Sequence, residues 1–103
     1  MSEVKTKPVP ARHFPSYERF DDELVAGSIF VAPVAEGQPQ EFWYCCPCGC
    51  GITAPLRVGR GFKPAAGPSW NWNGSLEAPT LYPSVHHQGH WHGWLRNGVW
   101  ESC

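Results

Sequence analysis

The chain has 103 residues, which is enough for one domain. Eight Lys and Arg residues stand against nine Asp and Glu residues, so the chain lacks the cationic surface with which proteins bind nucleic-acid phosphates or acidic membranes. No apolar run approaches the roughly 20 residues of a membrane-spanning helix, and the N-terminus lacks the apolar segment of a secretory signal. We therefore expect a protein of the reducing cytoplasm without a membrane partner.

The predicted elements are short and mostly strands, because eleven Gly and eleven Pro interrupt a chain in which 14% of the residues are aromatic. Residues 1–13 show no periodicity and are expected to form a flexible arm. One helical turn is predicted over residues 16–24, with Ser16 as its N-cap. Strands are predicted over residues 28–33, 41–46, 52–58 and 70–72.

The last part of the chain contains the clearest hairpin, predicted over residues 90–101 around an Asn-Gly turn. Before it, residues 76–84 are expected to be extended or irregular. His86 and His87 are expected in a solvated loop. The sequence therefore predicts a mainly β fold, with a small α+β fold at most, in a single compact domain over residues 14–103.

Four of the five cysteines are crowded into one predicted turn. Cysteines so close together pair poorly in disulfides, and in a reducing compartment such a cluster is typical of a metal site. Thiolate and imidazole are the ligands that Zn²⁺ prefers, in tetrahedral sets of four. On an extended strand, His90 and His92 project from the same face, whereas Cys45 points away from its neighbour in the cluster and is the least favoured cysteine. The candidate Zn²⁺ ligands are Cys46, Cys48, Cys50, His92 and Cys103.

A redox motif and a catalytic zinc site are two other uses of these residues. A redox Cys-x-x-Cys motif over residues 45–48 is typical of the start of a helix, but here the motif lies between two predicted strands. A catalytic zinc site keeps one position for water and needs a base nearby. The nearby carboxylates, Glu77 and Glu101, belong to no metallohydrolase motif. The sequence therefore favours a structural Zn²⁺ that joins the central hairpin to the C-terminal one, with no catalytic residue assigned.

The six tryptophans form a second feature of the sequence. Most are expected in the core, because a small β domain with few aliphatic residues needs large rings to fill it. One or two are expected to stay exposed beside the basic cluster of the central loop, a composition typical of a surface that binds a protein partner. The candidate partner-binding residues are Arg57, Arg60, Lys63, Trp70 and Trp72.

Several segments of the chain occur in the order found in a known family. These are residues 20–31, 46–51, 83–85 and 92–98, and residues 70–84 are especially similar to one branch of that family. In this order they resemble a family of small phage and prophage proteins, some of which carry an ammonia-monooxygenase label. The resemblance covers about residues 14–103 and implies a compact, β-rich, zinc-binding domain.

The resemblance also implies a ligand set. In the most similar branch of that family a Cys precedes the late His, and a further Cys lies beyond the Asn-Gly or Asp-Gly turn. His92 and Cys103 match the His and the last Cys. The preceding Cys is absent here, because Gly89 and Trp91 stand in that region, and His90 is the candidate substitute.

One functional hypothesis and two alternatives follow from these observations. The protein is expected to be a phage or prophage accessory protein, a structural-zinc module that binds a host or phage protein in the cytoplasm of the host cell. The first alternative is a zinc-dependent hydrolase of a small amide or ester, with a base such as Glu77. The second alternative is single-stranded nucleic-acid binding through residues 70–72, which the charge balance disfavours.

Overall fold

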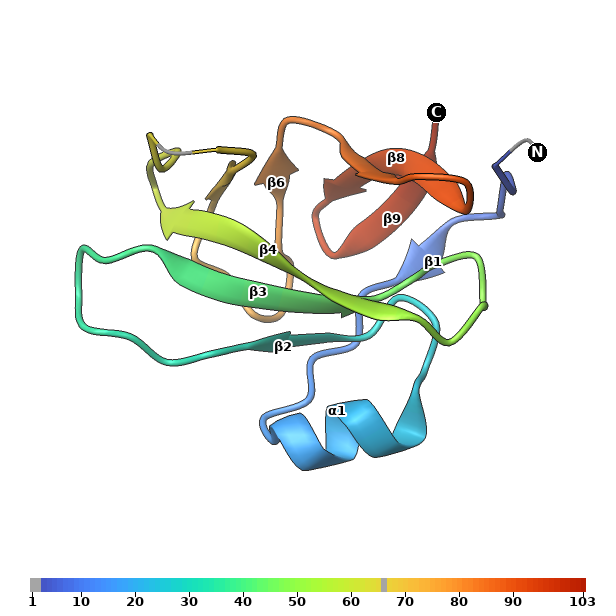
Figure 1. Cartoon of the computed structure of the whole chain (residues 1–103), viewed down its shortest axis with the longest axis horizontal. Helices are drawn as coiled ribbons and strands as arrows, with labels where there is room; N and C mark the ends of the chain where they lie inside the picture. The colour runs from blue at the N-terminus through green and yellow to red at the C-terminus, as the bar shows by residue number, and fades with distance from the viewer. Residues whose placement is uncertain (1–2, 66) are drawn as a thin grey trace.

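A computed structural model of the protein describes residues 3–65 and 67–103. Within these ranges the chain forms two β-sheets and a short helix, stacked in three layers (Figure 1). In chain order the elements are β1 (Val9–Pro10), α1 (Tyr17–Glu23), β2 (Ile29–Val31), β3 (Gln40–Cys45), β4 (Thr53–Arg60), β5 (Trp70–Trp72), β6 (Leu81–Tyr82), β7 (Val85–His87), β8 (Trp91–Arg96) and β9 (Val99–Ser102). The prediction of a mainly β fold is confirmed.

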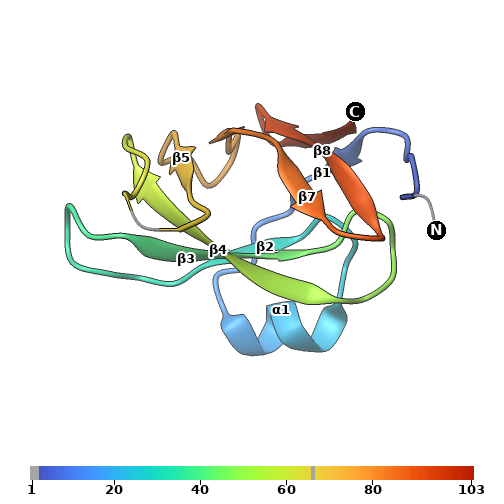
Figure 2. The same ribbon diagram turned by 45° about the horizontal axis from the view of Figure 1, so that its top comes forward.

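The two sheets pack face to face, as Figure 2 shows for β7 and β8 above β2, β3 and β4. One sheet has the strand order β1-β9-β8-β7 and the other the order β2-β3-β4-β5-β6. Large rings fill much of the space between them, because each removes about 150–250 Å² from water. The buried aromatic residues of this core are Phe42, Tyr44, Trp72, Trp91 and Trp100.

The alternation of side chains along β8 separates the core from the outer face of the four-stranded sheet. Trp91, Gly93 and Leu95 are buried, whereas His92 and Trp94 between them are only half-buried. Successive side chains of a strand point to opposite faces, so the buried set faces the other sheet. The outer face of this sheet therefore carries a histidine on β8.

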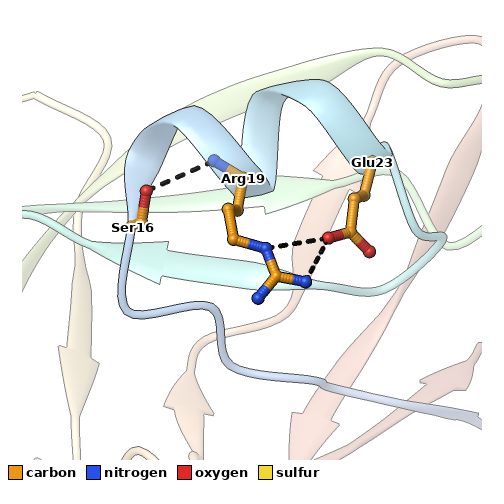
Figure 3. Close-up of polar contacts among 3 residues, drawn as sticks. All are labelled: Ser16, Arg19 and Glu23. Carbon is orange, nitrogen blue, oxygen red and sulfur yellow. Dashed lines mark hydrogen bonds and ion pairs between the residues drawn. The ribbon is translucent and has the colours of Figure 1, made fainter.

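The helix α1 covers the face of the five-stranded sheet that points away from the core (Figure 1). Ser16 caps it by accepting a hydrogen bond from the backbone N–H of Arg19 at 3.3 Å, and Arg19 pairs with Glu23 one turn later (Figure 3). Phe20 is buried against Cys45 in a second small core. The predicted helical turn and its cap are confirmed. No helix in the described part of the chain has the length and apolarity needed to cross a membrane.

The segment expected to be a flexible arm is packed along the four-stranded sheet. The backbone N–H of Thr6 donates to Ser102 Oγ at 2.9 Å, and the indole N–H of Trp91 donates to Thr6 Oγ1 at 3.2 Å. β1 pairs with β9. Residues 3–13 are therefore part of the folded domain, because β9 offers them a free strand edge. Residues 1–2 of the predicted arm lie outside the described residues.

Two short strands lie where the sequence predicts irregular or loop structure. β6 pairs with β5, and β7 pairs with β8 so that His86 lies opposite His92 and His87 opposite Trp91. His86 and His87 thus belong to a strand and not to a solvated loop, and His87 is half-buried. Strands of two or three residues show almost no periodicity in a sequence, and here pairing with a longer neighbour defines them.

The close packing at Gly93 gives a test of the β8–β9 pairing. A Cβ at this position would overlap the carbonyl oxygen of Glu101 and the ring of Trp91. We expect Gly93→Ala to lower the free energy of unfolding by about 1–3 kcal/mol, because the backbone must move to relieve the overlap. Urea unfolding measures this. Gln88→Ala, in the exposed β7–β8 turn, is the control, with a change within about 0.5 kcal/mol. Equal stabilities for both variants would contradict the packing described.

Candidate active site

A serine and a histidine meet on the outer face of the four-stranded sheet. His92 lies opposite His86 in the β7–β8 register. Ser84 directly precedes β7, so alternation places its side chain on the same face as that of His86. Ser84 Oγ and His92 Nε2 are 3.1 Å apart, and both side chains are partly buried. This distance is a hydrogen-bond distance between the serine hydroxyl and the ring nitrogen.

The backbones of the two residues are held by contacts from other parts of the chain. The indole N–H of Trp70, on β5, donates to the carbonyl oxygen of Ser84 at 3.0 Å. The backbone N–H of Cys103 donates to the carbonyl oxygen of His92 at 3.0 Å. The first bond reaches across from the five-stranded sheet, and the second continues the β8–β9 pairing. Both sheets therefore fix the position of the Ser84–His92 pair.

A second histidine and two carboxylates lie around this pair. The rings of His86 and His92 have their centroids 4.7 Å apart, and Glu3 Oε2 is 3.5 Å from His86 Nε2. Glu101 lies opposite Trp94 on the same outer face. In residues 3–65 and 67–103 no carboxylate oxygen lies within 4.0 Å of the His92 ring nitrogens. The arrangement is therefore a serine–histidine dyad with acidic groups at a greater distance.

A cavity of about 320 Å³ lies against the histidine of the dyad. It is lined by Glu3, Val4, Lys5, His92 and Cys103. A hydroxyl next to an imidazole acts as a nucleophile once the imidazole accepts its proton, and it needs room for a reacting carbonyl group. The dyad pairs a hydroxyl with an imidazole, and the cavity lies on the histidine side of that pair.

A separate cluster of three cysteines lies at the β3–β4 turn. The sulfur atoms of Cys46, Cys48 and Cys50 all lie within 4.8 Å of one another, and Cys46 Sγ donates to Cys48 Sγ at 3.3 Å. Burial raises the pKa of Cys46. Burial also opposes ionisation of Cys48, but hydrogen bonds from its two cysteine neighbours and from backbone N–H groups outweigh it and lower the pKa of Cys48. Three close sulfurs, one of them favoured as thiolate, can hold a metal ion.

Two of the predicted metal ligands lie apart from this cluster. In the described part of the chain the group of close ligand atoms contains neither His92 nor Cys103. His92 points to the outer face and contacts Ser84, whereas Cys46 is buried in the core between the sheets. The two hairpins are therefore not joined through His92 as expected, because its strand presents it to the opposite side. Cys45 points away from the cluster into the core beneath the helix, as alternation predicts.

The predicted partner-binding residues differ in burial and in the contacts that they make. Trp72 is fully buried, so its ring is not available to a partner, and Trp70 is half-buried with its indole N–H bonded to the dyad backbone. Arg60 lies over the ring of Trp72 at 5.2 Å, Lys63 Nζ donates to a serine hydroxyl at 3.1 Å, and Arg57 is exposed on β4. The two tryptophans thus serve packing and positioning.

Ser84 has no signal in the sequence that marks it as functional. It lies in a stretch expected to be irregular, and no Gly-x-Ser-x-Gly turn surrounds it. Its relation to His92 exists only through the pairing of β7 with β8. A prediction of that short strand and its register would have placed the two side chains on one face.

Comparison with known proteins adds an independent observation. A family model described as "BubE: Bacterial ubiquitination-like system serine protease" matches residues 16–103. The chain belongs to this family. Searches of curated proteins and of solved structures gave no significant match. A serine protease family agrees with the Ser84–His92 pair that the fold creates.

Membership of the BubE family corrects the functional hypothesis drawn from the sequence. A phage accessory module that uses structural zinc to bind a protein partner is wrong, because the family description is that of a protease. The hydrolase alternative was closer, since proteolysis is hydrolysis of an amide. It assigned the chemistry to zinc, however, whereas the family description names serine. Nucleic-acid binding through residues 70–72 has no support in this match.

The bond from Trp70 to Ser84 can be tested by removing the indole N–H. We expect Trp70→Phe to lower the free energy of unfolding by about 1 kcal/mol, because the Ser84 carbonyl loses its donor, and to shift the NMR signals of the His92 ring. Trp43→Phe is the matched control, since Trp43 is also half-buried but packs near the helix. The control should leave the His92 signals in place. A Trp70→Phe variant with unchanged His92 signals would contradict this positioning role.

Proposed function

We propose that the protein is a serine peptidase of a bacterial ubiquitination-like system, with Ser84 as nucleophile and His92 as general base. The observation that carries this proposal is the 3.1 Å distance between Ser84 Oγ and His92 Nε2. Membership of the BubE family supports it. The proposed substrate is an amide bond of a ubiquitin-like protein or of its conjugate.

The proposed reaction has two half-reactions, and His92 moves a proton in each. His92 Nε2 accepts the hydroxyl proton while Ser84 Oγ attacks the carbonyl carbon of the substrate. The tetrahedral adduct collapses, the C–N bond breaks, and the leaving amine takes the proton from His92. The ester that remains on Ser84 is then attacked by water, with His92 again as base. Breaking the ester bond returns the proton to Ser84 and releases the new carboxylic acid.

The cavity beside His92 is the proposed place for the substrate. Its walls include Glu3, Val4 and Lys5 from the N-terminal segment. This segment precedes residues 16–103, which match the family. The cavity therefore combines a histidine from within the matched residues with side chains from the segment before them.

We propose that Zn²⁺ binds at Cys46, Cys48 and Cys50 in a structural role. Soft thiolates are the donors that zinc prefers, and three of them lie within 4.8 Å of one another. The cysteines lie at the β3–β4 turn, with Cys46 buried in the core and Cys48 packed against it. The dyad lies on the outer face of the other sheet. The free energy of zinc binding would stabilise the folded chain. The proton transfers described above involve only Ser84 and His92.

A fluorophosphonate probe tests the nucleophile, because it reacts with an activated serine hydroxyl. We expect labelling at Ser84, identified by mass spectrometry of the labelled peptide. Ser84→Ala should abolish it. His92→Ala should slow it by about 100-fold or more, since general-base catalysis of this kind contributes about 10²–10⁴-fold.

Ser75→Ala is the control for the labelling experiment. Ser75 lies in a turn, where its hydroxyl accepts a hydrogen bond from the backbone N–H of Ala78 at 2.9 Å. This variant should be labelled at the wild-type rate. The proposed function is rejected if Ser84→Ala is labelled as fast as the wild type, or if His92→Ala has no effect on the rate.

Metal analysis of the purified protein tests the proposed zinc site. We expect about one zinc ion per chain and a lower melting temperature after treatment with a chelator, because a structural ion stabilises only the folded chain. Cys48→Ser should lose the ion. Cys103→Ser should keep it, since Cys103 lies outside the cluster. Equal zinc content in both variants would contradict the assignment of the ligands.

A further inference from the structure

One buried nitrogen of the β7–β8 hairpin has no partner. His87 Nδ1 is buried, and no hydrogen-bond partner for it is present among the described residues. A buried polar atom without a partner costs about 1–3 kcal/mol, so native structures rarely leave one unexplained. A metal ion is one partner to which an unbonded ring nitrogen of this kind could bind as a ligand.

The strand pattern of β7 directs His87 toward the other sheet. Val85 is fully buried in the core between the sheets, and His87 lies two residues further on the same face. His86, between them, is exposed on the outer face with the dyad. His87 therefore faces the layer that contains Cys46, while the dyad histidine faces away from it.

Tyr44 of β3 borders both His87 and the cysteines. Its ring meets that of His87 edge-on, with the centroids 6.0 Å apart. Tyr44 also stands two residues before Cys46, at the end of β3 that leads into the cysteine turn. Figures 1 and 2 both show the β7–β8 turn beside the β3–β4 turn. The two turns are therefore neighbours at one end of the sandwich.

We propose that His87 is the fourth ligand of the zinc ion, through Nδ1, and completes a tetrahedral site with Cys46, Cys48 and Cys50. This inference rests on the zinc site proposed above. Three sulfurs and one nitrogen form a closed set of the kind found in structural zinc sites. The His87 nitrogen lies outside the 4.8 Å group of sulfurs, so metal binding would require the exposed β7–β8 turn to move toward the β3–β4 turn.

His90 is the competing ligand, because its ring centroid lies 4.6 Å from that of His87. His87 and His90 differ in whether a buried ring nitrogen lacks a hydrogen-bond partner. Among the described residues, His87 has a buried side-chain nitrogen without a partner, and no such nitrogen occurs in His90. The unmet bonding capacity therefore lies at His87.

This assignment links the metal to the position of the dyad. Ser84 directly precedes β7, His92 lies on β8, and His87 ends β7. An ion bound to His87 and to the β3–β4 turn fastens this hairpin to the five-stranded sheet at the end opposite the bond from Trp70 to Ser84. The hairpin would then be held at both ends.

Cobalt substitution in the full-length chain tests the ligand. We expect wild-type protein with Co²⁺ to show the absorption of a tetrahedral site with three thiolates. His87→Ala should lower zinc affinity by about tenfold or more in competition with a chelator, since loss of even an indirect partner of a metal costs about 10–100-fold. His87→Cys should keep a tetrahedral spectrum with a stronger sulfur-to-metal band. A residue that only packs against the site would not add that band.

His90→Ala and His86→Ala are the matched controls, and both should bind zinc with wild-type affinity. The inference is overturned if His87→Ala binds as tightly as the wild type, if His87→Cys adds no sulfur band, or if His90→Ala is the variant that loses zinc. A wild-type chain that binds no metal would reject the zinc site as well. Fluorophosphonate labelling at Ser84 reports separately on the serine peptidase and does not depend on these outcomes.

Discussion

The pairing of β7 with β8 is the interaction on which the Ser84–His92 pair depends. Its register places His86 opposite His92 and brings Ser84, just before β7, to the same outer face. A shift by one residue would turn the side chains of β7 to the other face and separate the dyad. The register is itself fixed by the core, because Val85, Trp91 and the residues beyond them must face the other sheet.

The same alternation divides the hairpin between two roles. Its outer face carries Ser84 and His92, and its inner face carries His87 toward the layer of the cysteines. The Ser84–His92 pair and the buried Cys46 therefore lie on opposite sides of the four-stranded sheet. In the function proposed above, a zinc ion would support the hairpin, while Ser84 would carry out the chemistry that the BubE family name describes.

Predictions that rest on local rules agree with the structure. The Ser16 cap and the helical turn follow from the side chain of one residue and its neighbours, and the strands around the cysteine turn follow from β-branched and aromatic runs. Grouping of Cys46, Cys48 and Cys50 also follows from spacing, since a turn keeps residues two apart close together. The pairing of the N-terminal β1 with β9 does not follow from local rules, because β9 lies at the far end of the chain.

By itself the sequence determined the class of fold and the residue types able to do chemistry, because both depend on composition and short spacings. Only the tertiary structure decided which side chains meet. His92 stands beside Ser84 and not among the cysteines because three-residue β7 pairs with β8 in one register. A strand that short carries no periodic signal, so its position is set by long-range packing of the two sheets.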